Sequence, residues 1–201
     1  MAKIYKTRIQ KSFVKSMGQT AMKNVAYKVA QKRMQEAKEN VVERFESHPV
    51  TLEVEGGPTA SNLSGTLGGY GNLFSYIGFS VGENPTEPLR QYLNKRPRVY
   101  KTSKFIKRSK SGEWVFRMEL PTTSDMETLA GSPWEGRSWI RGVEKGISGL
   151  GYYLYSRKGL LSGSRSGTGI QQDSKIRSMP FKPITYMSSI LAKFKKELNI
   201  R

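Results

Sequence analysis

The sequence predicts an α+β protein with a long N-terminal helix, an antiparallel β-sheet with a short helix, and a C-terminal helix. Three observations lead to this prediction. Residues 9–46 lack proline and carry apolar residues three to five positions apart. Segments in which apolar and polar residues alternate follow them, and a second helical stripe of apolar residues lies near the C-terminus. We therefore expect a long basic helical arm over residues 1–46 and an α+β domain over residues 47–201.

The N-terminal helix is predicted by one apolar stripe among cationic faces. Its members are Phe13, Met17, Ala21, Val25, Val29, Met34, Ala37, Val41 and Phe45. At about 1.5 Å per residue such a helix would be about 55 Å long. That length exceeds a compact domain of this size, so part of the helix is expected to project or to pack on another subunit. The alternative is two shorter helices that break near Gly18.

Two strands are predicted after this helix, which Pro49 ends. Residues 50–57, "VTLEVEGG", alternate apolar and polar side chains as a half-buried strand does, and residues 72–79, "NLFSYIGF", form an apolar run. Between these two segments, the small and uncharged residues 56–71 predict a loop that is mobile or ordered by a partner.

A short helix and a hairpin come next. Thr86 is a candidate N-cap, and Pro88 then lies in the first turn of the helix. Residues 98–120 predict a β-hairpin, because "EWVFRMEL" alternates apolar and charged residues after a turn that contains glycine. With its basic flank this hairpin covers about residues 95–120.

The last third of the chain is predicted to hold three further elements. Residues 137–147 fit either a strand or a short helix, and the tyrosines and glycines of residues 148–156 favour a strand. A C-terminal helix is expected at about residues 184–199. Its apolar stripe is Met187, Ile190, Leu191, Phe194 and Leu198.

Charge narrows the classes of partner. The chain has 34 Lys and Arg against 16 Asp and Glu, a net charge of +18. Nucleic acid is the first partner to consider for such a chain, and an acidic protein surface is the second. Cysteine is absent, which excludes disulfides and thiolate chemistry. No apolar run approaches the about 20 residues of a membrane helix, and we expect neither a signal peptide nor a membrane partner.

Catalytic patterns are scarce. The segment "GFSVG", residues 78–82, matches a nucleophile elbow around Ser80, but His48, the only histidine, precedes it in the chain. The glycine-rich stretches fit neither the P-loop nor the dinucleotide-binding pattern. We therefore expect no enzymatic activity, no cofactor and no metal.

The strongest candidate surface is a run of cations interleaved with Tyr100 and Phe105. Its members are Lys95, Arg96, Arg98, Lys101, Lys104, Lys107, Arg108 and Lys110. Such a mixture suits phosphate neutralisation with aromatic stacking, and without a base-reading motif any contact would be independent of sequence. An acidic neighbouring protein and a solvated face are the two alternatives.

The organisation of the chain resembles the neck and tail-completion proteins of tailed bacteriophages. Those proteins similarly show a "VE-x-G" segment with small and aromatic residues and then a proline-started C-terminal helix, which correspond here to Val143, Glu144 and Gly146 and to the helix after Pro183. The segments that carry the resemblance, after the long charged N-terminal helix, are "RFESHPVTLEVEGG", "NLFSYIGF", "WEGRSWIRGVEKGISGLGYYLY" and "MPFKPITYMSSILAKFKKEL".

The resemblance implies a structural virion protein, made in the host cytoplasm. Copies would form a hexameric or dodecameric ring between portal or adaptor proteins and tail proteins, with genomic DNA in the channel. Residues 146–169 would then supply a strand near a subunit interface and a loop ordered by a neighbour or directed into the channel, whereas a core strand with a disordered loop is the alternative. The candidate interface residues there are Tyr152, Tyr153, Tyr155, Arg157, Lys158 and Arg165. A stand-alone nucleic-acid-binding module is the main rival, and an assembly chaperone is a third interpretation.

Overall fold

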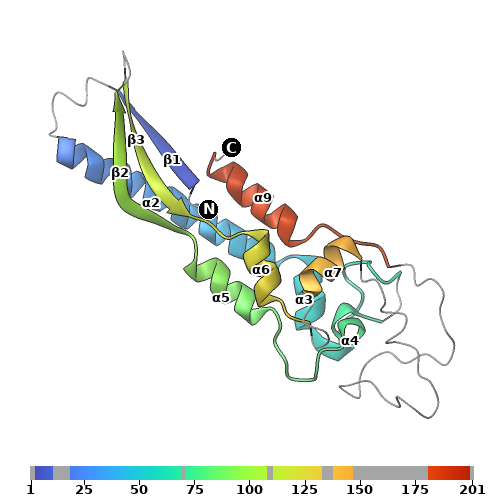
Figure 1. Ribbon diagram of the computed structural model, residues 1–201. Coiled ribbons are helices and arrows are strands. Elements are labelled where there is room, and N and C mark those ends of the chain that lie inside the picture. The colour runs from blue at the N-terminus through green and yellow to red at the C-terminus, as the bar shows by residue number, and fades with distance from the viewer. Residues whose placement is uncertain are drawn as a thin grey trace, which may run out of the picture. The chain divides into compact units, whose positions relative to one another are not determined.

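The computed structural model of the chain describes residues 3–10, 19–68, 71–107, 111–132, 138–146 and 181–199 (Figure 1). The predicted strand at residues 148–156 and the candidate interface residues from Tyr152 to Arg165 lie outside these ranges. The elements are β1 (Lys3–Gln10), α2 (Gln19–Glu46), α3 (Pro49–Glu55), the 3-10 helix η1 (Gly57–Thr59), α4 (Leu73–Ile77), α5 (Glu87–Lys95), β2 (Arg98–Lys107), β3 (Ser111–Glu119), α6 (Thr123–Leu129), α7 (Trp139–Lys145) and α9 (Met187–Glu197).

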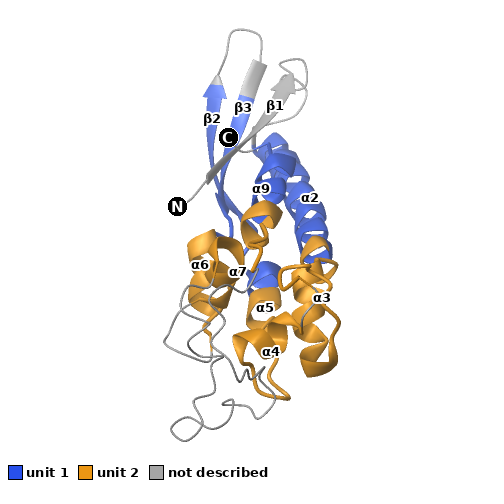
Figure 2. Ribbon diagram, turned by 90° about the vertical axis from the view of Figure 1, so that its right-hand side faces the viewer, with its two compact units in different colours: residues 1–43, 92–122, 191–201 blue, residues 44–91, 123–190 orange. Residues whose placement is uncertain are grey.

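The predicted α+β class is confirmed, and the chain forms two compact units (Figure 2). Unit 1 consists of residues 1–43, 92–122 and 191–201, and unit 2 consists of residues 44–91 and 123–190.

Unit 1 is built on an antiparallel sheet with strand order β1-β3-β2. The predicted hairpin is confirmed, and its apolar residues Trp114, Phe116 and Met118 are buried. The helix α2 packs on this sheet, because the ring centroid of Tyr27 lies 5.8 Å from that of Phe116. The Tyr27 hydroxyl also donates a hydrogen bond of 3.3 Å to the carbonyl oxygen of Val99.

The start of the predicted N-terminal helix is wrong. Residues 3–10 form the strand β1, which pairs with β3, and α2 begins only at Gln19. The predicted stripe is also displaced by one position in the first half of α2. Val25 and Val29 are 51% and 41% exposed, and the alanines at positions 26 and 30 are buried instead. Two stripes one residue apart have the same helical spacing, and packing selects the one with smaller side chains.

Unit 2 corrects two predicted strands, because residues 49–55 and 73–77 are the helices α3 and α4. His48 caps α3 by accepting the N–H of Val50 at its ring Nδ1, and Val50 and Val54 are buried one turn apart. In α4 the side chain of Asn72 accepts the N–H of Ser75, and Gly78 ends the helix in the left-handed conformation, at φ 88°.

The core of unit 2 gathers around Tyr186, which precedes α9. Its ring packs 5.9 Å from Trp139 and 6.2 Å from Phe45, and its hydroxyl lies 2.7 Å from the hydroxyl of Thr51. The backbone N–H of Tyr186 donates to the carboxylate of Glu144 on α7. This packing fixes the start of the predicted C-terminal helix, which is confirmed, and all five residues of its predicted stripe are buried.

Candidate functional site

The β2–β3 hairpin of unit 1 presents two different faces. Trp114, Phe116 and Met118 of β3 point to the core, so their neighbours Arg117 and Glu119 lie on the outer face. A β-bulge interrupts the pairing, because Val99 pairs with Met118 and Ser103 pairs with Phe116, which leaves residues 100–102 opposite Arg117 alone. Within this bulge, Tyr100 of β2 lies beside Arg117 of β3.

Glu119 is the centre of a network on the outer face. Its carboxylate accepts a hydrogen bond of 2.6 Å from the Tyr100 hydroxyl and lies 2.8 Å from Nη2 of Arg96 and 3.4 Å from Nε of Arg98. The hydrogen bond from Tyr100 lowers the pKa of Glu119, and the charges of the nearby arginines lower it further. The same bond raises the pKa of the Tyr100 phenol. Near neutral pH this network therefore consists of an ionised carboxylate, a neutral phenol and charged guanidinium groups.

Two arginines near this network, Arg96 and Arg117, each lie over an aromatic ring. The guanidinium carbon of Arg117 lies 5.4 Å from the ring centroid of Tyr100, and that of Arg96 lies 5.9 Å from the ring centroid of Tyr92. Both distances fall within the range of cation–π contacts. The two arginines are held in place and remain exposed.

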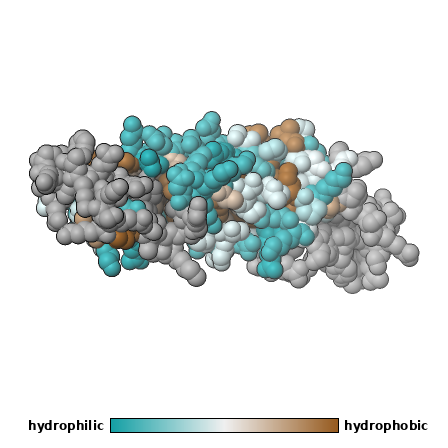
Figure 3. Space-filling view, turned by 90° about the horizontal axis from the view of Figure 1, so that it is seen from above, coloured by the Kyte–Doolittle hydropathy of each residue, from teal (hydrophilic) through white to brown (hydrophobic). Residues whose placement is uncertain are grey.

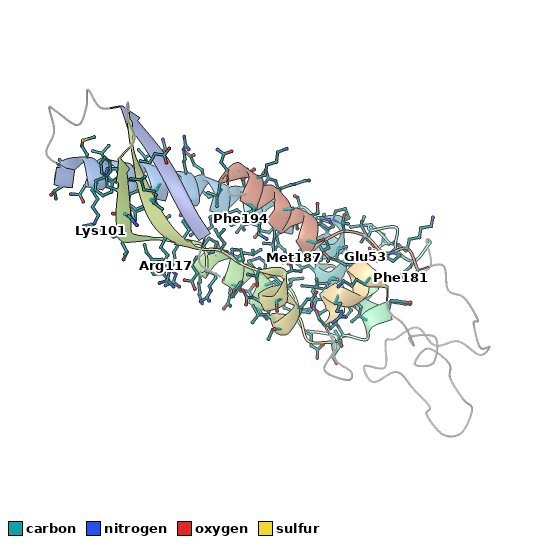
Figure 4. All side chains as sticks on the ribbon, turned by 45° about the horizontal axis from the view of Figure 1, so that its top comes forward. Glu53, Lys101, Arg117, Phe181, Met187 and Phe194 are labelled. Atoms are coloured by element: carbon teal, nitrogen blue, oxygen red, sulfur yellow. The ribbon has the colours of Figure 1, made fainter. Side chains whose placement is uncertain are left out.

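Exposed cations lie on and beside the β2–β3 hairpin. Of the predicted set, Arg96, Arg98, Lys101 and Lys104 are exposed on or beside β2, and Lys95 is exposed at the end of α5. The side chain of Lys107 and all of Arg108 and Lys110 lie outside the described residues. Lys101 and Arg117 lie along the hairpin in Figure 4. We call Arg96, Arg98, Lys101, Lys104 and Arg117 the hairpin cationic face.

Arg117 and Glu119 were not among the residues predicted for this site. The signal was present, because the alternation in "EWVFRMEL" places both on the charged side of β3. The prediction followed a run of cations along the chain, whereas the site is assembled across two strands.

Comparison with protein-family models, with curated proteins and with solved structures found no match for this chain.

Unit 2 holds a second charged cluster, around Arg90 of α5. This guanidinium contacts Glu46 at 3.1 Å, Glu87 at 2.6 Å and also Glu55. A pocket of about 400 Å³ lies beside it and is lined in part by Glu55, Glu83 and Arg90. The three ion pairs join the end of α2, α3 and α5, so the cluster has a structural role in unit 2.

Ser80 and His48, the two residues of the nucleophile-elbow pattern, each make contacts of another kind. Ser80 follows the helix α4 rather than a strand, and its backbone N–H is bonded to the carboxylate of Glu83. The ring of His48, the only histidine, packs 4.8 Å from the ring of Tyr186 and caps α3. A nucleophile elbow needs its serine at the end of a strand, and this arrangement does not provide one.

Among the described residues, no group of three or more histidine, aspartate or glutamate side chains could hold a metal ion. None of the helices in those ranges is both long and apolar enough to cross a membrane. Figure 3 shows a face of the protein on which hydrophilic residues cover broad areas and hydrophobic residues form small, separate patches.

Proposed function

We propose that this chain is a structural subunit of a tailed-bacteriophage virion, in the neck or tail-completion region. Copies would form a hexameric or dodecameric ring around the DNA channel and contact portal or adaptor proteins and tail proteins. The observation that carries this proposal is the order of its segments: a long charged helix, "RFESHPVTLEVEGG", "NLFSYIGF", and a proline-started helix at the C-terminus. A subunit of this kind performs no chemical reaction and needs no cofactor.

The composition supports an assembly subunit. Apolar residues make up 36% of the chain, which is lean for a globular protein, and subunits with a modest core find further burial in an assembly. The long helix α2 exposes Val25 and Val29 one turn apart. The net charge of +18 suits a protein that surrounds a polyanion.

The test is the mass of the purified protein, freed of nucleic acid, by light scattering at low and high salt. Negative-stain images of the same fractions would show whether closed rings are present. Rings, or an oligomer that forms with rising concentration and without nucleic acid, support the proposal. A monomer at all concentrations that also fails to bind isolated portal, adaptor or tail proteins contradicts it.

A second candidate function is sequence-independent nucleic-acid binding by a stand-alone protein. The hairpin cationic face favours it, because its five cations are exposed and two of its arginines are held at the Glu119 carboxylate. Such a protein would remain a monomer or dimer, and its affinity for DNA would fall steeply with salt. The light-scattering experiment separates the two candidates by ring formation.

A further inference from the structure

We propose that the hairpin cationic face binds the sugar–phosphate backbone of double-stranded DNA, without base contacts and without base stacking. This inference deepens the proposed function, because a subunit that surrounds a DNA channel needs a surface for phosphates. It rests on the structure of unit 1 alone, and its test does not depend on ring formation.

The charge balance of the face selects an anionic ligand. Arg96, Arg98, Lys101, Lys104 and Arg117 are exposed, and the side chain of Glu119 among them is only 23% exposed. These five exposed cations outnumber the nearby carboxylates of β3, which are Glu119 and the buried Glu113, so the surface is net positive. Double-stranded DNA offers the matching pattern, with one negative charge per about 1.7 Å of its axis.

Glu119 organises the arginines without using up their donors. Arg96 reaches it through Nη2. Arg98 reaches it through Nε and also donates a long hydrogen bond of 3.5 Å from Nη2 to the carbonyl oxygen of Lys95. Each guanidinium has further N–H groups beyond these contacts that can meet phosphate oxygens. A guanidinium that is already oriented loses less freedom when it binds an anion. The face is therefore arranged for phosphate contacts before any ligand arrives.

The aromatic residues of the hairpin favour a duplex over a single strand. Phe105 packs against Trp114, with ring centroids 4.9 Å apart. Tyr100 is bonded to Glu119 through its hydroxyl and is covered by the guanidinium of Arg117. Proteins that bind single strands stack bases on open aromatic rings, and in this hairpin each of the two rings already has a packing partner. The proposal therefore uses contacts to the DNA backbone, whereas the sequence suggested aromatic stacking as well.

The test measures binding of a short fluorescent DNA duplex of random sequence by anisotropy, over a series of salt concentrations. The double substitution Lys101→Gln and Lys104→Gln removes two cations from the face. We expect about tenfold weaker binding, and a fall of about two in the slope of log affinity against log salt, since each phosphate contact contributes about 0.9. Arg117→Gln should lower the slope by about one.

A matched control removes the same charge elsewhere in unit 1. Lys193→Gln with Lys196→Gln takes two exposed lysines, also three positions apart, from α9. The control should change affinity less than twofold. All of these side chains are exposed, so the free energy of unfolding of every variant in urea should lie within about 0.5 kcal/mol of that of the parent protein.

Three outcomes would overturn the inference. Equal losses in the hairpin variant and in the control would mean that total charge acts, not this face. Tighter binding of a single strand than of the duplex would mean that bases are stacked. No binding of duplex at low salt would remove DNA as the ligand, and binding of an acidic protein in its place would assign the face to a protein partner.

Ring assembly and DNA binding can be tested separately. The hairpin variant should assemble as the parent protein does, because the proposal gives Lys101 and Lys104 a role in DNA binding and not in assembly. If the parent protein binds DNA but forms no rings, only the virion function is contradicted. A hairpin variant that forms rings but has lost DNA binding is the result that we expect.

Discussion

At the scale of single residues, two buried or half-buried glutamates hold backbone rather than ligands. The carboxylate of Glu53, which is fully buried, accepts the N–H of Ser64 at one oxygen and the N–H of Leu73 at the other, both at 2.7 Å. The carboxylate of Glu144 accepts the N–H groups of Tyr186 and Ser188 at the start of α9. Each carboxylate therefore satisfies donors that the helix ends and loops leave without a backbone partner.

The role of Glu53 leads to a prediction about stability. In Glu53→Gln the side-chain NH₂ group would face one of the two backbone N–H donors, and that donor would lose its partner. We expect a loss of about 2 kcal/mol in the free energy of unfolding, since hydrogen bonds to charged groups contribute about 1.5–3 kcal/mol. Urea unfolding measures this value. Glu36→Gln on the exposed surface of α2 is the control, and similar losses in both variants would contradict the structural role of Glu53.

The Glu119 network makes a second prediction, about pH. The hydrogen bond from Tyr100 is the main cause that lowers the pKa of Glu119, so Tyr100→Phe should raise that pKa toward its ordinary value. A lowered pKa in the folded state adds stability above the pKa of the unfolded chain, and this stability is lost as pH falls through the folded pKa. In Tyr100→Phe the free energy of unfolding should therefore decrease less as pH falls through the range in which Glu119 titrates.

Carboxyl NMR titration of Glu119 in both proteins measures the change. Tyr92→Phe is the control, because Tyr92 supports Arg96 through its ring and phenylalanine retains that contact. An unchanged pKa of Glu119 in Tyr100→Phe would show that the arginines alone determine it.

At the scale of elements, the sequence predicted secondary structure correctly where the apolar residues of a segment fitted only one periodicity. The stripe of α9 fits a helix and no other element, and the alternation of β3 is paired with a turn, so both were predicted correctly. Val50, Leu52 and Val54 alternate as a strand does, but Val50 and Val54 are also one helical turn apart. Pro49 in the first turn and His48 at the N-cap favour the helix, which the alternation of apolar residues alone could not indicate.

The candidate site shows the same limit. Its cations on β2 were predictable from the local sequence, whereas the approach of Arg117 and Glu119 depends on the register of two strands and on a bulge. The apolar run "NLFSYIGF" was ambiguous in another way, because a short buried helix and a buried strand look alike in sequence. Its cap residue Asn72 and its terminating Gly78 were the signals for the helix.

The end of α4 supplies a third prediction. Gly78 has φ 88°, where a side chain is strained, so Gly78→Ala should destabilise unit 2 by about 1–2 kcal/mol. Gly131→Ala is a matched control, because Gly131 has no left-handed backbone and nothing lies within 4 Å of an added methyl group. Thermal or urea unfolding of the two variants compares them. Equal stability would show that the conformation of Gly78 is not required.

At the scale of the whole molecule, charge sets the response to salt. The net charge of +18 makes the compact chain repel itself, although local clusters such as that around Arg90 are attractive. Screening weakens both kinds of interaction between exposed charges, and the repulsion is summed over many more pairs. Salt should therefore stabilise the fold while it weakens binding to DNA, in which Lys and Arg displace the counterions of the phosphates.

We expect the melting temperature to rise when sodium chloride increases from about 50 mM to about 200 mM, a range over which the affinity of proteins with many phosphate contacts falls strongly. Differential scanning calorimetry and anisotropy on the same protein preparation measure both effects. Lys101→Gln with Lys104→Gln should weaken the salt dependence of both the melting temperature and the affinity for DNA, because it removes two positive charges. A melting temperature that falls with salt would show that ion pairs, including those of Arg90, outweigh the repulsion of the excess cations.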